Sequence, residues 1–293
     1  MTGWIDEVIT RLVNDCVITI GKSILQHGKY NDRIYLMKLS KDDFPDIIDQ
    51  LDHLAKEKGY SKIFAKVPEY ANDDFIKNGY QVEAKIPGFF NGKEDVYFLG
   101  KYFSGSRKLD TRIAEINTIL NVAGSKKSKK NFNVIDPALS HGFNYKICDR
   151  SCVFQMADLY RKVFDTYPFP IFDPQYLLKT MDENFIYSSM WKNDTIVALS
   201  SCEMDVKAQN VEMTDFATLQ EYQGKGLAIY LLNNMEKEMR KRKIKTAYTI
   251  SRAVSYGINI IFVKMGYEYC GTLVNNTNIS GNFESMNVWY KLL

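Results

Sequence analysis

The segment Gln223–Ala228, with the sequence Gln-Gly-Lys-Gly-Leu-Ala, has the residue types of an anion-binding turn. Its two glycines, Gly224 and Gly226, allow the backbone to adopt positive φ and to bring its N–H groups close to a ligand. An amphipathic pattern runs from Leu227 to about Arg242, so a helix is expected to begin in the turn. Because the first turn of a helix carries unpaired N–H donors and a positive dipole end, the segment predicts a phosphate site. An ordinary strand-to-helix turn is the alternative.

The spacing excludes two common phosphate-binding motifs. A P-loop ends in Gly-Lys-Ser/Thr, and a dinucleotide site has GxGxxG early in a βαβ unit, and neither pattern fits. The pattern QxxGxA resembles instead the signature of the GNAT acetyltransferases, which bind the pyrophosphate of acetyl-CoA at this turn. The resemblance implies that acetyl-CoA is the cosubstrate, without a metal. The contacts that it implies are Phe216, Ala217, Thr218, Gln223, Gly224, Lys225, Gly226, Leu227 and Ala228.

A carboxylate stands where the same resemblance implies a general base. Histone-type members of the family carry this base eleven residues before the Gln, and Glu212 has this position. A lysine-like amine has a pKa of about 10.4, so its deprotonation at pH 7 costs about 4.6 kcal/mol and a base is chemically useful. An exposed strand glutamate is the alternative reading. Asp215 is expected on the opposite face of a regular strand unless a bulge intervenes, and it is a candidate to bind a substrate ammonium.

The resemblance also implies that the strand after Glu212 diverges from its neighbour, so that its backbone can pair with the pantetheine arm. The proton donor to the leaving thiolate is often a tyrosine in the last helix, but Phe262 stands at that place. Tyr256, another tyrosine or water is expected to replace it. Asn259, one turn before Phe262, is a candidate contact to the coenzyme, or else a surface asparagine.

Substrate choice is expected in the proline- and aromatic-rich segment Asp165–Pro174, in which Asp173 is a candidate to face a cationic substrate. A structural lid is the competing interpretation. Together with Glu212–Thr218, and over most of the chain, this segment resembles the β-lysine N6-acetyltransferases. That resemblance implies acetylation of the N6-amine of β-lysine to N6-acetyl-β-lysine, a neutral zwitterion used as an osmolyte. Arg252, at the end of an expected strand, is a candidate to hold the substrate carboxylate.

The elements that must position these residues alternate between strand and helix patterns, which predicts a mixed α/β sheet with a GNAT fold in the C-terminal half. Strands are expected at residues 143–147, 185–191, 195–205, 210–219, 246–251, 267–274 and 286–291, and helices at 153–164, 227–242 and 255–265.

The N-terminal part resembles a degenerate copy of this half. Phe75–Tyr80 shares Phe, Lys, Gly and Tyr with Phe262–Tyr267, and an expected strand at 63–67 corresponds to 247–251. Where the copy needs its phosphate turn, Ser40–Phe44 has two carboxylates and no glycine, so one coenzyme site is expected. We therefore expect a degenerate GNAT-like domain at residues 1–109, a helical and basic linker at 110–140, and a catalytic domain at 141–293.

Composition narrows the class of partner. The 38 Lys and Arg residues nearly balance 35 Asp and Glu, so no overall basic field indicates nucleic acid or a membrane surface. The N-terminus lacks a leader pattern and the apolar runs are too short to span a bilayer, so the cytoplasm is expected. The lysines of 124–130 predict a solvated linker rather than a phosphate contact. Reduced cysteines are expected at Cys16, Cys148, Cys152, Cys202 and Cys270.

The expected partner is a small-molecule amine, with a homodimer possible. Two other functions remain open at this point: a protein lysine or polyamine N-acetyltransferase, and a non-catalytic scaffold built from two GNAT-like halves.

Overall fold

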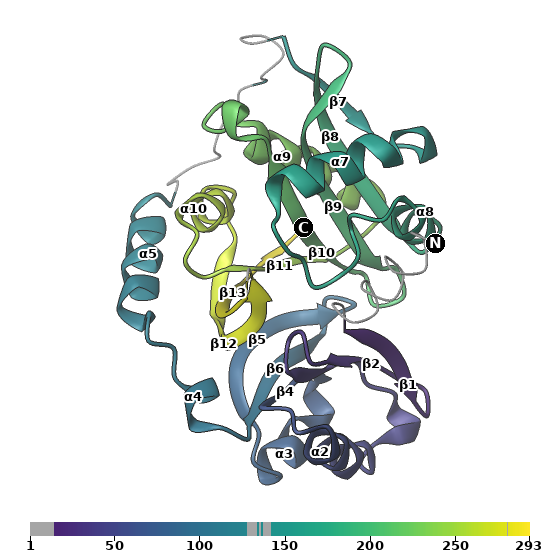
Figure 1. Cartoon of the computed structure of the whole chain (residues 1–293), viewed down its shortest axis with the longest axis vertical. Helices are drawn as coiled ribbons and strands as arrows, with labels where there is room; N and C mark the ends of the chain where they lie inside the picture. The colour runs from purple at the N-terminus through teal and green to yellow at the C-terminus, as the bar shows by residue number, and fades with distance from the viewer. Residues whose placement is uncertain (1–14, 128–133, 135, 137–141, 280) are drawn as a thin grey trace, which may run out of the picture.

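One continuous sheet of 13 strands forms the centre of the molecule, with strand order β1-β2-β3-β4-β6-β5-β12-β13-β11-β10-β9-β8-β7 (Figure 1). The computed structural model describes residues 15–127, 134, 136, 142–279 and 281–293. Residues 1–14 lie outside the described residues, as do 128–133, 135 and 137–140 of the expected linker at 110–140. The mixed α/β sheet predicted from the sequence is confirmed.

The C-terminal half has four antiparallel strands, a parallel crossover through a helix, and a closing hairpin. Its strands are β7 (Asn144–Ile147), β8 (Phe185–Lys192), β9 (Thr195–Asp205), β10 (Asn210–Thr218), β11 (Thr246–Arg252), β12 (Glu268–Ile279) and β13 (Asn282–Leu292). Its helices are α7 (Val153–Val163), α8 (Pro174–Asp182), α9 (Leu227–Lys241) and α10 (Tyr256–Lys264), with single turns η2 (Arg150–Cys152) and η3 (Gln220–Tyr222). The expected elements all form, and α8 is an additional helix.

The described part of the N-terminal half, from β1 to β6, repeats the order of strands and helices that runs from β8 to β13 in the C-terminal half. Its parallel pair is β3–β4 with α2 between the two strands, as β10–β11 enclose α9, and β4 then pairs with the second strand of a hairpin, as β11 does. Its strands are β1 (Cys16–Ile20), β2 (Ser23–Gly28), β3 (Arg33–Lys38), β4 (Lys62–Pro68), β5 (Gln81–Phe90) and β6 (Glu94–Tyr102), and its helices are α2 (Ile47–Lys58) and α3 (Glu69–Lys77), with the single turn η1 (Lys41–Asp43). The half-repeat inferred from short sequence matches therefore extends to the topology.

The two halves meet where β5 crosses β12, and Figure 1 shows this contact in the middle of the molecule. The strands approach so closely that a Cβ on Gly271 would lie 2.0 Å from the carbonyl oxygen of Glu83. Beside the crossing, the buried Lys62 ammonium binds the Glu83 carboxylate at 2.9 Å and donates to the carbonyl of Val274 at 2.8 Å. Because a buried charge needs both a counter-charge and hydrogen bonds, this arrangement ties β4 and β5 to β12.

Helices cover the outer faces of the sheet. Helices α2 and α3 pack on one face of the N-terminal half, while α9 and α10 pack on one face of the C-terminal half. The linking helix α5 (Ile113–Ser125), which follows the short α4 (Gly105–Lys108), lies along α10 (Figure 1). Among the described residues, no helix has both the length and the apolar character needed to span a membrane.

The remaining face of the C-terminal half is covered by two different parts of the chain. Helices α7 and α8 cover its outer strands, with Tyr187 and Leu199 in that core. The N-terminal half covers its central strands, and there Tyr35 and Phe64 share a core with Tyr248 of β11. The two halves therefore share one interior over the central strands of the sheet, beside the part of this face that α7 and α8 cover.

Candidate active site

The turn between β10 and α9 has the backbone of an anion site. Gly224 and Gly226 adopt φ of 77° and 76°, in the left-handed region that favours glycine. A Cβ on Gly224 would meet nothing within 4 Å, so backbone conformation rather than space requires glycine there. No side chain caps the N-terminus of α9 at Gly226, which leaves the first N–H groups of the helix available to a ligand. The turn is exposed, and Gln223 reaches back to donate to the carbonyl of Thr218 at 3.3 Å.

Strands β10 and β11 diverge beyond Glu212, in the way that the family resemblance implies. Strand β10 pairs with β11 at three positions, from Asn210 to Glu212, although both strands continue well beyond that point. On its other side, β10 has an irregularity between Thr214 and Ala217. The backbone of residues 216–218 therefore faces β11 without pairing to it, and an extended ligand can bind along such an edge.

Glu212 lies at the point where the strands diverge. It is partly buried, opposite Glu203 of β9 and in parallel register with Tyr248 of β11. Burial, followed by the charge of Glu203, raises the pKa of Glu212 to about 8, while Lys66 and Tyr248 oppose the rise. Burial also raises the pKa of Glu203. A carboxylate that titrates near neutrality is suited to accept a proton from an amine.

Asp215 reaches the same face of the sheet through a bulge. Its φ of 55° is unusual for a residue other than glycine and turns the strand at the irregularity. Its carboxylate is buried and accepts hydrogen bonds from Ser201 at 2.5 Å and from the Tyr167 hydroxyl. Burial raises the pKa of Asp215 and these hydrogen bonds oppose the rise. Asp215 thus anchors the segment 165–174 to β10, and both of its oxygens already have donors.

The N-terminal half supplies the wall opposite Glu212. The Lys66 ammonium of β4 lies 5.8 Å from the ring centre of Tyr248 and 5.9 Å from that of Phe89. Tyr35 of β3 is buried nearby, and its ring stacks at 4.5 Å on Phe64. The pKa of Lys66 is raised: burial opposes the rise, and the charges of Tyr35, Glu212, Glu203 and Asp205 outweigh it.

The N-terminal half also holds the proline-rich segment in place. The amide of buried Gln26 donates to the carbonyl of Pro168 at 3.0 Å. Gln26 stands opposite Tyr35, just as Glu203 stands opposite Glu212. Asp173, the expected contact to a cationic substrate, has an exposed side chain. Its carboxylate caps α8 by accepting a hydrogen bond from the N–H of Gln175 at 2.9 Å. An Asp before a Pro at the first helical position is a helix-start signal that was present in the sequence.

Two further expectations differ from the structure. Asn259 is fully buried, and its side chain donates to the carbonyls of Arg252 and Ser255 and accepts from Asn287 and Trp289. Because these bonds occupy its whole side-chain amide, Asn259 fixes the start of α10 and is corrected from a coenzyme contact to a structural residue. Arg252 forms a bidentate ion pair with Glu284, with both N–O distances 2.8 Å, so its guanidinium already has a carboxylate partner.

Sequence reasoning missed Glu203, Lys66, Tyr35 and Tyr248 as members of the site and named Tyr167 only as part of the segment 165–174. One signal was available, because Lys66 interrupts the otherwise apolar strand Ile-Phe-Ala-Lys-Val. At the usual position of the proton donor, Phe262 is fully buried against Phe216 and Tyr267. Tyr256 is exposed at the start of α10, where a hydroxyl can reach solvent.

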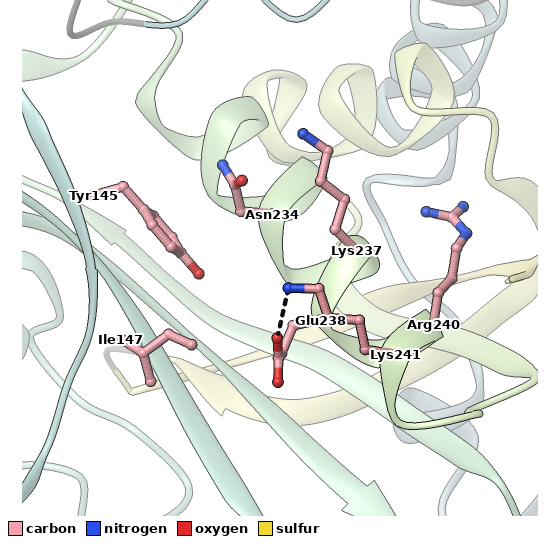
Figure 2. A pocket seen from close by; sticks show the side chains of 7 residues that line it. All are labelled: Tyr145, Ile147, Asn234, Lys237, Glu238, Arg240 and Lys241. Atoms are coloured by element: carbon pink, nitrogen blue, oxygen red, sulfur yellow. Dashed lines mark ion pairs between the residues drawn. The ribbon is translucent and has the colours of Figure 1, made fainter.

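A separate cleft of about 420 Å³ lies between β7 and the last turns of α9. Figure 2 shows Tyr145 and Ile147 on the strand side and Lys237, Arg240 and Lys241 on the helix side, with the Glu238–Lys241 ion pair of 3.5 Å. Helix α9 packs on the face of the sheet that holds Val211 and Met213, whereas Glu212 points to the other face. This cleft is therefore not part of the candidate active site.

Comparison with known proteins agrees with this geometry. A family model described as the acetyltransferase (GNAT) family matches residues 153–267. The chain is 47% identical over 276 residues to a protein of Methanococcus maripaludis named beta-lysine N(6)-acetyltransferase, with 94% of this chain and 98% of the relative covered. A Methanosarcina mazei protein of the same name is 32% identical, with 85% and 98% covered. The N-acetyltransferase YodP of Bacillus subtilis is 31% identical, with 92% and 96% covered.

Proposed function

The chain belongs to the GNAT acetyltransferase family, and on that premise we propose that it transfers an acetyl group from acetyl-CoA to the N6-amine of β-lysine. The observation that carries the proposal is the placement of Glu212 at the divergence of β10 and β11, at the other end of β10 from an uncapped glycine turn. Two relatives named beta-lysine N(6)-acetyltransferase, each covered over 98% of its length, support the choice of acceptor.

The residues present fit acetyl-CoA. The free N–H groups at the start of α9 suit a pyrophosphate, and the unpaired edge of residues 216–218 suits the amide-bearing arm. We propose that Gln223, Gly224, Lys225, Gly226, Leu227 and Ala228 hold the pyrophosphate and that Phe216, Ala217 and Thr218 line the arm. When bound, acetyl-CoA supplies an acetyl group activated as a thioester.

Glu212 accepts the proton of the attacking amine, directly or through one water. Its pKa is high in the free protein because of burial and the nearby Glu203 carboxylate. A diamine brings positive charge close to both groups, and an opposite charge favours the ionised form of a carboxylate. Binding of the acceptor therefore converts Glu212 into the base that the reaction needs. Tyr256 or water returns a proton to the leaving thiolate.

We further propose that the product serves as an osmolyte and is made in the cytoplasm. Acetylation of one of the two amines leaves one ammonium and one carboxylate, so the product has no net charge. The five cysteines are free in the structure, which agrees with a reducing compartment.

Thiol release from acetyl-CoA tests the proposal, with β-lysine, α-lysine, spermidine and a histone-tail peptide offered as acceptors. We expect β-lysine to give the highest kcat/KM and the product to carry its acetyl group on N6, as read by NMR. Preference for the peptide or for spermidine would show a different acetyltransferase. Absence of release with every acceptor would favour a non-catalytic module.

A further inference from the structure

Lys66 is a partly buried cation whose partners are incomplete. Among the described residues, its ammonium forms neither a hydrogen bond nor an ion pair within 4.0 Å, although it lies close enough to the carboxylates of Glu212 and Glu203 to feel their charge. Asp205, a third carboxylate on this side, is paired at 3.2 Å with Lys38. The neighbouring Lys62, by contrast, is saturated by Glu83 and Val274.

The residue at the equivalent position of the other half shows that a lysine is not required there by the fold. Strand residues 63–67 correspond to 247–251, so Lys66 is the counterpart of Ile250. Both side chains point into the interior between the halves, where Ile250 packs against the shared core. An isoleucine needs no polar partner at such a position, whereas an ammonium needs hydrogen-bond acceptors, which the described residues do not supply to Lys66. The lysine is therefore better explained by a ligand than by packing.

The charges facing this interior suit an amino acid with a second amine. Glu203 and Glu212 lie opposite each other on β9 and β10, Lys66 comes from β4 of the other half, and the charge of Glu212 acts on the buried Tyr35 and Tyr248. Carboxylates attract ammonium groups and a lysine attracts a carboxylate. Arg252 is less suitable for the carboxylate, because Glu284 already occupies its guanidinium.

We propose that Lys66, supplied by the N-terminal half, binds the carboxylate of the amino acid acceptor, and that this half thereby selects an amino acid over a simple diamine. This inference rests on the proposed function and assigns the degenerate half a role in substrate recognition. Lys66 lies on a different element from Glu212 and belongs to the specificity of the reaction rather than to proton transfer.

The test compares β-lysine with 1,4-diaminopentane, which is β-lysine without its carboxylate. Both acceptors are assayed by thiol release with the wild type, Lys66→Met, Lys66→Arg and the control Lys77→Met, which removes an exposed lysine of α3. Because the two acceptors are compared on the same variant protein, a loss of folded enzyme lowers both rates equally and does not imitate a change of specificity.

We expect the wild type to prefer β-lysine and Lys66→Met to lower kcat/KM for β-lysine by about 10- to 100-fold, chiefly through KM, because a charged hydrogen bond is lost. The ratio of kcat/KM for β-lysine to kcat/KM for 1,4-diaminopentane should fall by the same factor. Lys66→Arg should retain part of the preference, and Lys77→Met all of it. Because the charge of Lys66 lowers the pKa of Glu212, Lys66→Met should shift both pH profiles upward, so the two acceptors are compared at each pH. The inference is overturned if Lys66→Met lowers kcat/KM for both acceptors by the same factor at every pH, because Lys66 would then act only through Glu212. If the wild type uses 1,4-diaminopentane but not β-lysine, the proposed acceptor itself is wrong.

Discussion

Glu212 and Tyr35 occupy equivalent positions in the two halves of the molecule and face the same interior. Glu212 is in parallel register with Tyr248, and Tyr35 is in parallel register with Phe64, which corresponds to Tyr248 in the repeat. Burial raises the pKa of the Tyr35 hydroxyl, Lys66 opposes the rise, and the charge of Glu212 adds to it. One half thus carries an ionisable carboxyl group near the start of β10, and the other carries a buried phenol at the equivalent position.

Glu212→Gln should remove the base while preserving size. We expect kcat to fall by roughly 10²–10³-fold, because an amide cannot accept the ammonium proton. In the wild type, kcat/KM should rise with pH toward about 8, where Glu212 of the free enzyme becomes ionised. A pH–rate series for both proteins checks this. An unchanged rate and profile in the variant would show that Glu212 is not the base.

The same substitution should stabilise the fold at neutral and alkaline pH. The pKa of Glu212 is about 8 in the folded protein and lower in the unfolded chain, so the folded state binds its proton more tightly. Stability from this group is therefore fully present below about pH 4.3 and is lost as pH rises toward 8. The free energy of unfolding of Glu212→Gln should exceed that of the wild type by on the order of 1–2 kcal/mol at pH 8. This difference should disappear near pH 4, as measured by urea unfolding. A gap independent of pH would contradict this reasoning.

Gly226→Ala should weaken acetyl-CoA binding more than it weakens the fold. The residue has φ of 76° at the N-terminus of α9, and alanine resists this conformation by about 1 kcal/mol. The backbone N–H groups of the turn should shift, so KM for acetyl-CoA should rise about ten-fold. Gly257→Ala is the matched control, because Gly257 lies in α10 with open space around it and should be neutral or stabilising. Equal KM values in both variants would argue against the turn as the coenzyme site.

Asp215→Ala should destabilise the protein more than Asp215→Asn. Asparagine tolerates the φ of 55°, and its single amide oxygen can still accept one of the two hydrogen bonds from Ser201 and Tyr167, whereas alanine does neither. We expect Asp215→Ala to cost about 2 kcal/mol or more in urea unfolding and to loosen residues 165–174, detected as faster proteolysis. Equal stability of the two variants would mean that the bulge does not depend on these hydrogen bonds.

Local signals in the sequence were sufficient to predict many of the strands and helices and the glycine turn. The strand at residues 195–205 and the glycine turn were predicted at their observed places, because side-chain periodicity and positive-φ glycines act over a few residues. The spacing between Glu212 and Gln223 was informative for the same reason, since one strand and one turn separate them. Helix α8 was missed although Asp173 and Pro174 carry its start signal.

The tertiary structure alone decided which side chains meet. Asn259 looked like a surface or coenzyme-binding residue, but hydrogen bonds from Asn287 and Trp289, on another strand, make it part of the core. Lys66 and Glu212 are far apart in the chain and come together because the two halves share one curved sheet and one interior. Strand register, bulges and sheet curvature arise from non-local packing, which the pattern of any single segment does not contain. The sequence by itself determined the elements and the position of the turn, whereas the pairing of the two halves determined the composition of the site.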